Sequence, residues 1–125
     1  MMKRLPDTEL EVMKALWASG PDTPRAALEE ALASFGWASN TVNTYLARLA
    51  EKGFVSVHHA GRVNRYTPLV SREDYQAFDS QAVLSRLYGT PRNFVAALAR
   101  EGLGRQDLEE LRSLLDELEG GKSHD

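Results

Sequence analysis

The sequence of 125 residues contains no cysteine. Disulfide bonds, thiol catalysis and cysteine-ligated zinc or copper are therefore excluded. No apolar run approaches the roughly 20 residues that a membrane-spanning helix needs. The first residues, MMKRLPDTEL, also lack the apolar core of a signal peptide. We therefore expect a cytoplasmic protein that does not insert into membranes.

Histidine is also scarce, with 3 residues in the chain. His58 and His59 are adjacent in a predicted strand, so they point to opposite faces and cannot ligate one ion. His124 lies near the C-terminus. No nucleophile elbow, phosphate loop or metal-spaced cluster accompanies them. We therefore expect no enzyme, no catalytic residue, no metal site and no cofactor.

The segment that follows Trp37 predicts a helix with one apolar and one polar face. Val42, Tyr45, Leu46 and Leu49 recur at three- and four-residue steps, after Ser39 as an expected N-cap. The opposite face carries short hydrogen-bonding groups and one guanidinium, which suit DNA base edges and phosphates. Its residues are Asn40, Thr41, Asn43, Thr44 and Arg48.

A basic β-hairpin is predicted directly after this helix. Gly53 ends the helix, and two β-rich runs flank a turn at Ala60-Gly61 before Pro68. From Trp37 to Pro68, the charged residues are Arg48, Lys52, Arg62 and Arg65 against Glu51 alone, although the whole chain has a formal net charge of −3. Positive charge is therefore concentrated where phosphate binding would need it.

The order of the predicted elements indicates a winged helix-turn-helix. One helix precedes Ser19-Gly20-Pro21, and a second opens at Thr23-Pro24, where Thr23 is the expected N-cap. The segment 21–23 is a candidate third strand of the wing sheet. In this fold Asn43 and Thr44 would read base edges, while Arg48, Arg62 and Arg65 would position the duplex through phosphates. Lys3 and Arg4 are candidates for a further backbone contact.

Beyond Pro68 the composition becomes acidic and the apolar spacing is helical throughout. We predict a mainly α fold with a small β-wing, in which residues 1–70 form the winged helix and residues 71–125 form a three-helix dimerisation domain. Three short helices expose more apolar surface than they can cover alone, so a homodimer is the expected outcome; packing against the N-terminal domain is the alternative. The predicted dimerisation residues are Leu87, Leu108, Leu111, Leu115 and Leu118.

Four runs of sequence together resemble the penicillinase repressor (BlaI/MecI) family of winged-helix transcriptional regulators. They are LPDTELEVMKALW, TVNTYLARLAEKGFV, GRVNRYTPLVSREDY and LEELRSLLDEL. The resemblance implies a dimeric repressor that binds a palindromic double-stranded DNA operator. It also implies release by proteolysis in the dimerisation domain, triggered by a membrane-bound metalloprotease sensor as partner.

The family's cleavage point is an Asn-Phe bond, and this chain has Asn93-Phe94 in about that region. Aligning Tyr88-Gly89 with the family's aromatic-glycine pair instead puts the bond near Ala97-Leu98. Two other functions stay open from the sequence. One is a winged helix that binds an acidic protein without reading DNA. The other is a repressor gated by a small ligand near Trp37 or the aromatic residues of the second half.

Overall fold

A computed structural model describes residues 2–123 of the chain and shows the predicted mixture of helices with one small sheet. The chain divides into two compact units, residues 1–82 and residues 83–125. Each unit is described separately below. The fold class expected from the sequence, mainly α with a small β-wing, is confirmed.

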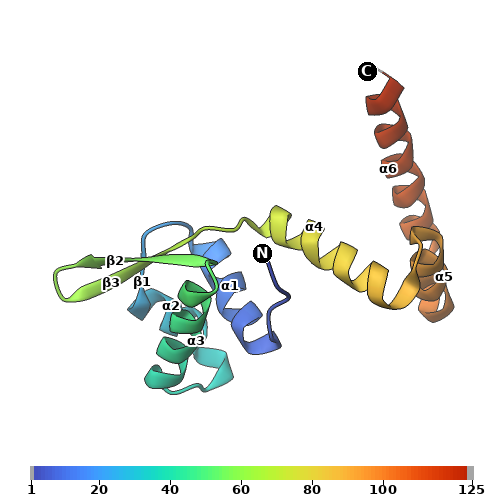
Figure 1. Ribbon diagram of the computed structural model, residues 1–125. Coiled ribbons are helices and arrows are strands. Elements are labelled where there is room, and N and C mark those ends of the chain that lie inside the picture. Colours follow the sequence, from blue (N-terminus) through green and yellow to red (C-terminus); the bar gives the residue numbers. More distant parts are fainter. Residues whose placement is uncertain (1, 124–125) are drawn as a thin grey trace. The chain divides into compact units, whose positions relative to one another are not determined.

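The first unit has the element order of a winged helix (Figure 1). Its elements are α1 (Asp7–Ser19), β1 (Thr23–Pro24), α2 (Arg25–Ala31), the 3-10 helix η1 (Ala33–Phe35), α3 (Ser39–Glu51), β2 (Val55–Ala60), β3 (Val63–Pro68) and α4 (Arg72–Val83). The sheet is antiparallel, in the order β1-β3-β2. In Figure 1 the β2–β3 hairpin projects beyond the helices α1 to α3 as a wing.

Strand β1 confirms that the wing sheet has a third strand, but it covers Thr23–Pro24 rather than the predicted segment 21–23. Thr23 pairs with Tyr66, and Pro24 pairs with Arg65. The prediction that Thr23 caps α2 is wrong, because its hydroxyl donates to the carbonyl oxygen of Gly20 at 2.9 Å and α2 begins after Pro24.

The core of the first unit lies where the three helices meet the sheet and α4. Its fully buried side chains come from helices and from the residue that directly precedes β2. They include Val12, Met13 and Leu16 of α1, Leu28 of α2, Leu46 and Leu49 of α3, and Phe54. Burial of this apolar surface is the main driving force for folding of the unit.

Helix α4 belongs to the first unit, although we expected the domain boundary after Val70. Ser71 caps α4 as predicted, since its hydroxyl accepts from the amide of Asp74 at 3.0 Å. Tyr75 is 4% exposed, and its hydroxyl accepts from the amide of Leu5 at 2.7 Å. Tyr75 therefore anchors α4 to the N-terminal arm. In the sequence, the first compact unit ends at Ala82.

The second unit consists of helices alone over its described part. They are the π-helical turn η2 (Leu84–Tyr88), α5 (Pro91–Gly102) and α6 (Arg105–Ser123). Thr90 caps α5, because its hydroxyl accepts from the amide of Asn93 at 3.2 Å, and Pro91 occupies the first turn. No residue from 83 to 120 is buried.

Candidate nucleic-acid interface

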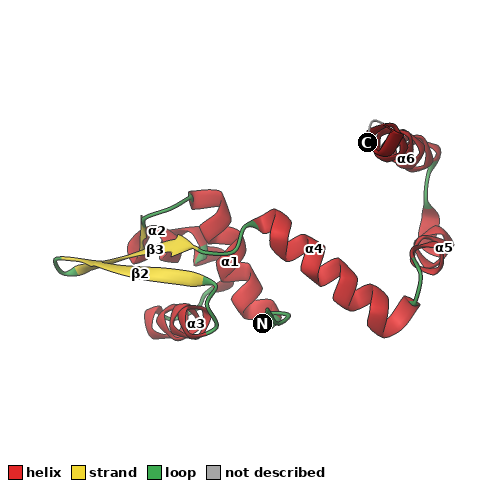
Figure 2. Ribbon diagram, turned by 45° about the horizontal axis from the view of Figure 1, so that its top comes forward, coloured by secondary structure: helices red, strands yellow, loops and turns green. Residues whose placement is uncertain are grey.

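Helix α3 presents the polar face that the sequence predicted. Its apolar stripe, Val42, Leu46 and Leu49, is buried in the core. Asn40 and Asn43 are exposed on the other side, as are Thr44 and Arg48, whereas Thr41 is half-buried. Figure 2 shows α3 beside the wing strands.

The side chains on this face keep hydrogen-bonding capacity for a partner. Thr44 donates its hydroxyl hydrogen to the carbonyl oxygen of Asn40 at 2.9 Å, so its oxygen can still accept. The exposed amides of Asn40 and Asn43 can donate and accept, which is the pattern that adenine presents in a major groove. The face is therefore chemically suited to base edges.

The start of α3 differs from the prediction. Ala38 occupies the N-cap position, and no side chain caps the helix. The Ser39 hydroxyl instead donates to the carboxylate of Glu29 on α2. Ser39 was wrongly predicted as the N-cap because its partner lies in another helix, which local sequence does not reveal.

The end of α3 is fixed to α1 by an ion pair between an exposed lysine and a buried carboxylate. The Lys52 ammonium lies 2.5 Å from the carboxylate of Glu9, and Glu9 is 2% exposed. Gly53 then adopts a φ of 82°, which favours glycine and ends the helix as predicted. The ion pair sets the position of α3 relative to α1, so it also orients the polar face.

The wing carries its two arginines in different situations. Arg62 is exposed in the turn between β2 and β3. Arg65 is half-buried and donates to the carbonyl oxygen of Asp22 at 3.1 Å, with the Asp22 carboxylate at 4.0 Å. Arg62 is therefore the more available cation, while Arg65 also holds the loop before β1 against the sheet.

His58 and His59 are both exposed neighbours in β2. His58 is paired with Arg65, and His59 with Asn64. A hydrogen bond of 2.6 Å joins His59 Nδ1 and Asn64 Oδ1.

Over the described residues, no three His, Cys, Asp or Glu side chains gather as a metal site would require. No helix within residues 2–123 is both long and apolar enough to cross a membrane.

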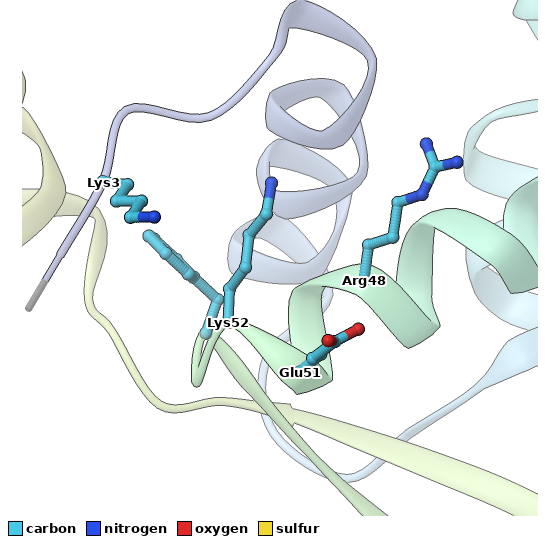
Figure 3. A pocket seen from close by; sticks show the side chains of 5 residues that line it. Lys3, Arg48, Glu51 and Lys52 are labelled. Atoms are coloured by element: carbon cyan, nitrogen blue, oxygen red, sulfur yellow. The ribbon is translucent and has the colours of Figure 1, made fainter.

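An open pocket of about 420 Å³ lies beside the C-terminal end of α3. It is lined by Lys3, Arg48, Glu51, Lys52 and Phe54. Figure 3 shows Lys3 reaching in from the N-terminal arm, while Arg48, Glu51 and Lys52 come from α3 and its end. Arg48 and Lys3 thus line one pocket, a juxtaposition that sequence spacing does not reveal.

Arg4, the neighbour of Lys3, has a different role. Its guanidinium donates to the carboxylate of Asp79 on α4 at 2.7 Å. This hydrogen bond and the charge of the carboxylate raise the pKa of the Arg4 guanidinium above its usual value. Of the two N-terminal cations that were candidates for a backbone contact, only Lys3 lines the pocket.

The predicted dimerisation residues mostly lie on the surface of the second unit. The exposed fractions are 74% for Leu87, 44% for Leu108, 58% for Leu115 and 55% for Leu118, whereas Leu111 is half-buried. Leu98 and Leu114, which were not among the predicted dimerisation residues, are also 46% and 48% exposed. Exposed leucines therefore occur on both α5 and α6.

The candidate cleavage bond lies in the first turn of α5. Asn93 donates its side-chain amide to the carbonyl oxygen of Tyr88 at 3.0 Å. Phe94 packs edge-on against the Tyr88 ring, with centroids 5.0 Å apart. Its amide donates to the carbonyl oxygen of Thr90 at 3.1 Å. Asn93 and Phe94 therefore lie within the hydrogen-bonded first turn of α5.

Comparison with protein families gives a match over most of the chain. The family model described as penicillinase repressor matches residues 5–117. The penicillinase repressor of Bacillus licheniformis is 35% identical over 121 residues, which cover 93% of this chain and 94% of that protein. The methicillin resistance regulatory protein MecI of Staphylococcus aureus (strain N315) is 26% identical over 110 residues, covering 86% and 89%.

A solved structure matches at the level of one domain. It is the solution structure of the DNA-binding domain of the repressor BlaI, with 36% sequence identity and a TM-score of 0.52. The match covers 60% of this chain and 94% of that domain.

Proposed function

The chain belongs to the penicillinase repressor family, and from this premise we propose that it is a dimeric transcriptional repressor that binds a palindromic operator through α3 and the wing. The family consists of transcriptional repressors rather than enzymes. The proposal gives the two units separate tasks, DNA recognition in the first and dimerisation in the second.

The observation that carries the proposal is the exposed polar face of α3 beside a local excess of positive charge. Asn43 and Thr44 offer hydrogen bonds to base edges. Arg48 on α3 and Arg62 on the wing are exposed cations. They would bind phosphates and fix the register of the duplex. Most of the negative charge of the chain lies elsewhere, in the second half.

A dimer would explain the exposed leucines of the second unit. Leu108, Leu111, Leu115 and Leu118 follow the three- and four-residue spacing of one helix face. A second copy offers the same face, as a two-fold interface requires. A two-fold pair of winged helices matches the two half-sites of a palindrome.

Release would occur by proteolysis in the second unit, triggered by a membrane-bound metalloprotease sensor. Both candidate bonds, Asn93–Phe94 and Ala97–Leu98, fall within α5. A protease binds its substrate in an extended conformation, so the helix must open locally before cleavage. Cutting α5 would separate α6 from the rest of the chain and remove most of the proposed interface.

The first test is selection of bound duplexes from a random library by the full chain. We expect a palindromic consensus and affinity that falls steeply with salt. Recovery of no consensus would overturn the proposal and favour binding of an acidic protein partner instead.

Two variants then test the proposed interface. Asn43→Ala should change the preferred sequence at one position of each half-site, by about 1–3 kcal/mol. Arg62→Ala should weaken binding to all sequences about equally and lower the salt slope by about 1. An unchanged preference in Asn43→Ala would mean that another face of α3 meets the bases.

A further inference from the structure

The pocket between the N-terminal arm and the end of α3 is built from groups that attract an anion. Its lining holds the cations Lys3, Arg48 and Lys52 against one carboxylate, Glu51. We propose that Lys3 and Arg48 bind one backbone phosphate of the DNA duplex in this pocket, and that α4 positions Lys3 through the N-terminal arm. The inference rests on the proposed function and extends it to an element outside the helix-turn-helix and the wing.

The ion pairs of the first unit leave two cations available in the pocket. Lys52 is paired with the buried carboxylate of Glu9. Among the described residues, neither Lys3 nor Arg48 has a side-chain hydrogen bond or ion pair. Both residues line an open space of about 420 Å³ that would hold a phosphate together with water.

The place of the pocket fits a duplex that α3 reads. Arg48 follows Thr44 by one helical turn, so both belong to one side of the helix. If Asn43 and Thr44 face base edges, the strand that borders the groove passes the end of α3 where Arg48 lies. Lys3 would then meet the same strand from the N-terminal arm, on the other side of the labelled side chains from Arg48 (Figure 3).

The N-terminal arm is held by α4 at the two residues after Lys3. Arg4 donates to the carboxylate of Asp79 at 2.7 Å, and the amide of Leu5 donates to the hydroxyl of Tyr75 at 2.7 Å. These bonds limit the positions that Lys3 can reach. Asp79 and Tyr75 are therefore positioning residues, which act on the phosphate through the arm.

A free phosphorylated molecule shares this chemistry, so the experiment separates it from DNA. The duplex selected by the full chain is titrated at several salt concentrations with the wild type, Lys3→Ala and Lys14→Ala. Lys14 is an exposed lysine of α1 that pairs with Glu11 at 3.1 Å, and it serves as the matched control.

Lys3→Ala should weaken binding about fivefold to tenfold at low salt and lower the salt slope by about 1, because one phosphate contact is lost. Lys14→Ala should leave the slope unchanged. Equal effects of the two variants would overturn the inference, since general charge would then explain both. A wild-type chain that selects no duplex overturns the proposed function as well, whereas wild-type binding with an unchanged Lys3→Ala overturns only the pocket.

The role of α4 is tested by Asp79→Asn and by the double variant with Lys3→Ala. Asp79→Asn should lower the salt slope by less than 1 while its midpoint of thermal unfolding stays close to that of Lys14→Ala. The double variant should bind no more weakly than Lys3→Ala, because Asp79 acts only through Lys3. Additive losses would show that Asp79 affects binding by another route.

The last experiment uses inorganic phosphate. Phosphate is titrated into the full chain without DNA, while NMR follows the Lys3 and Arg48 side chains. We expect little change at millimolar phosphate, since one phosphate ion lacks the neighbouring contacts of a duplex. Saturable shifts at both residues, together with unchanged duplex binding by Lys3→Ala, would assign the pocket to a free anion.

Discussion

In the first unit the side chains of Met13, Leu16 and Leu46 are 0% exposed, whereas in the second unit no residue from 83 to 120 is buried. Leucine is frequent in both units, so the difference in burial comes from the number of helices and strands that surround each leucine. Helices α1 to α4 and the sheet surround one core, while α5 and α6 have too few elements around them. The first unit thus completes its core within one chain, whereas the second leaves an apolar face exposed, which we propose a second copy covers.

The two units also differ in how their charge is distributed. The first unit has ten Asp or Glu and nine Lys or Arg, but α3 together with Lys52 at its end, the wing and the N-terminal arm are locally positive; the second unit has eight Asp or Glu and six Lys or Arg. A duplex would therefore be expected to meet the locally positive elements of the first unit rather than the second unit. Four predictions test this contrast.

The largest effect should come from placing charge on the exposed leucines of α6. Leu111→Glu combined with Leu115→Glu should weaken dimerisation on the order of 1,000-fold or more, because an interface would have to bury the added carboxylates. Sedimentation equilibrium measures the change. Ser113→Glu, which adds the same charge on the opposite side of α6, is the control and should stay dimeric. A double variant that remains a dimer would place the interface elsewhere.

Leucine truncation should have opposite consequences in the two units. Leu46→Ala should lower the free energy of unfolding of the first unit by about 2–5 kcal/mol, because it leaves a cavity in a closed core. Leu114→Ala, made in the monomeric double variant, should change the second unit by less than about 1 kcal/mol, since its side chain is already 48% exposed. Hydrogen exchange resolved by residue follows both units. Similar losses would show that the second unit has a core of its own.

Removing Lys52 should destabilise the first unit alone. Lys52→Ala leaves the Glu9 carboxylate buried without its partner, and we expect a loss of about 2–3 kcal/mol in urea unfolding. Adding Glu9→Gln should recover part of the loss, because the buried charge is then gone. Lys14→Ala removes an exposed pair and should cost about 0.5 kcal/mol or less. If Lys52→Ala behaves like Lys14→Ala, the Glu9 carboxylate must reach water.

The smallest effect should come from the N-cap of α5. Thr90→Ala removes the acceptor for the Asn93 amide and should weaken the first turn by about 1 kcal/mol. Local opening would then be about fivefold more frequent, so a protease should cut near Asn93–Phe94 correspondingly faster. Mass spectrometry of limited digests locates the bond, and Ser113→Ala serves as the control. Equal rates in both variants would mean that opening of this turn does not limit cleavage.

Much of the fold could be predicted because its signals are local. The apolar spacing of α3, the glycine that ends it and the β-rich runs of the hairpin lie within a few residues of the structure they specify. The Ser71 cap and the third strand at Thr23 were found in the same way. The exposed face of α3 then followed from the period of the helix, without knowledge of any neighbour.

The rest depends on residues far apart in the chain. Ser39 does not cap α3 because Glu29 accepts its hydroxyl hydrogen. The first compact unit extends to Ala82, because Tyr75 of α4 bonds to Leu5, 70 positions away. Periodicity within one segment carries no information about such partners. The pairing of Arg65 with Asp22 and the placing of Lys3 beside Arg48 were beyond the sequence for the same reason.

The placement of the aromatic side chains gives the protein two optical reporters in one unit. The chain has 2 tryptophans. Trp17 donates its indole hydrogen to the carbonyl oxygen of Val70 at 2.8 Å, whereas Trp37, just before α3, stacks on Phe35 with ring centroids 4.6 Å apart. Tryptophan emission therefore follows the first unit only, while far-ultraviolet circular dichroism sums both. If circular dichroism changes on heating or dilution before tryptophan emission does, α5 and α6 unfold before the first unit.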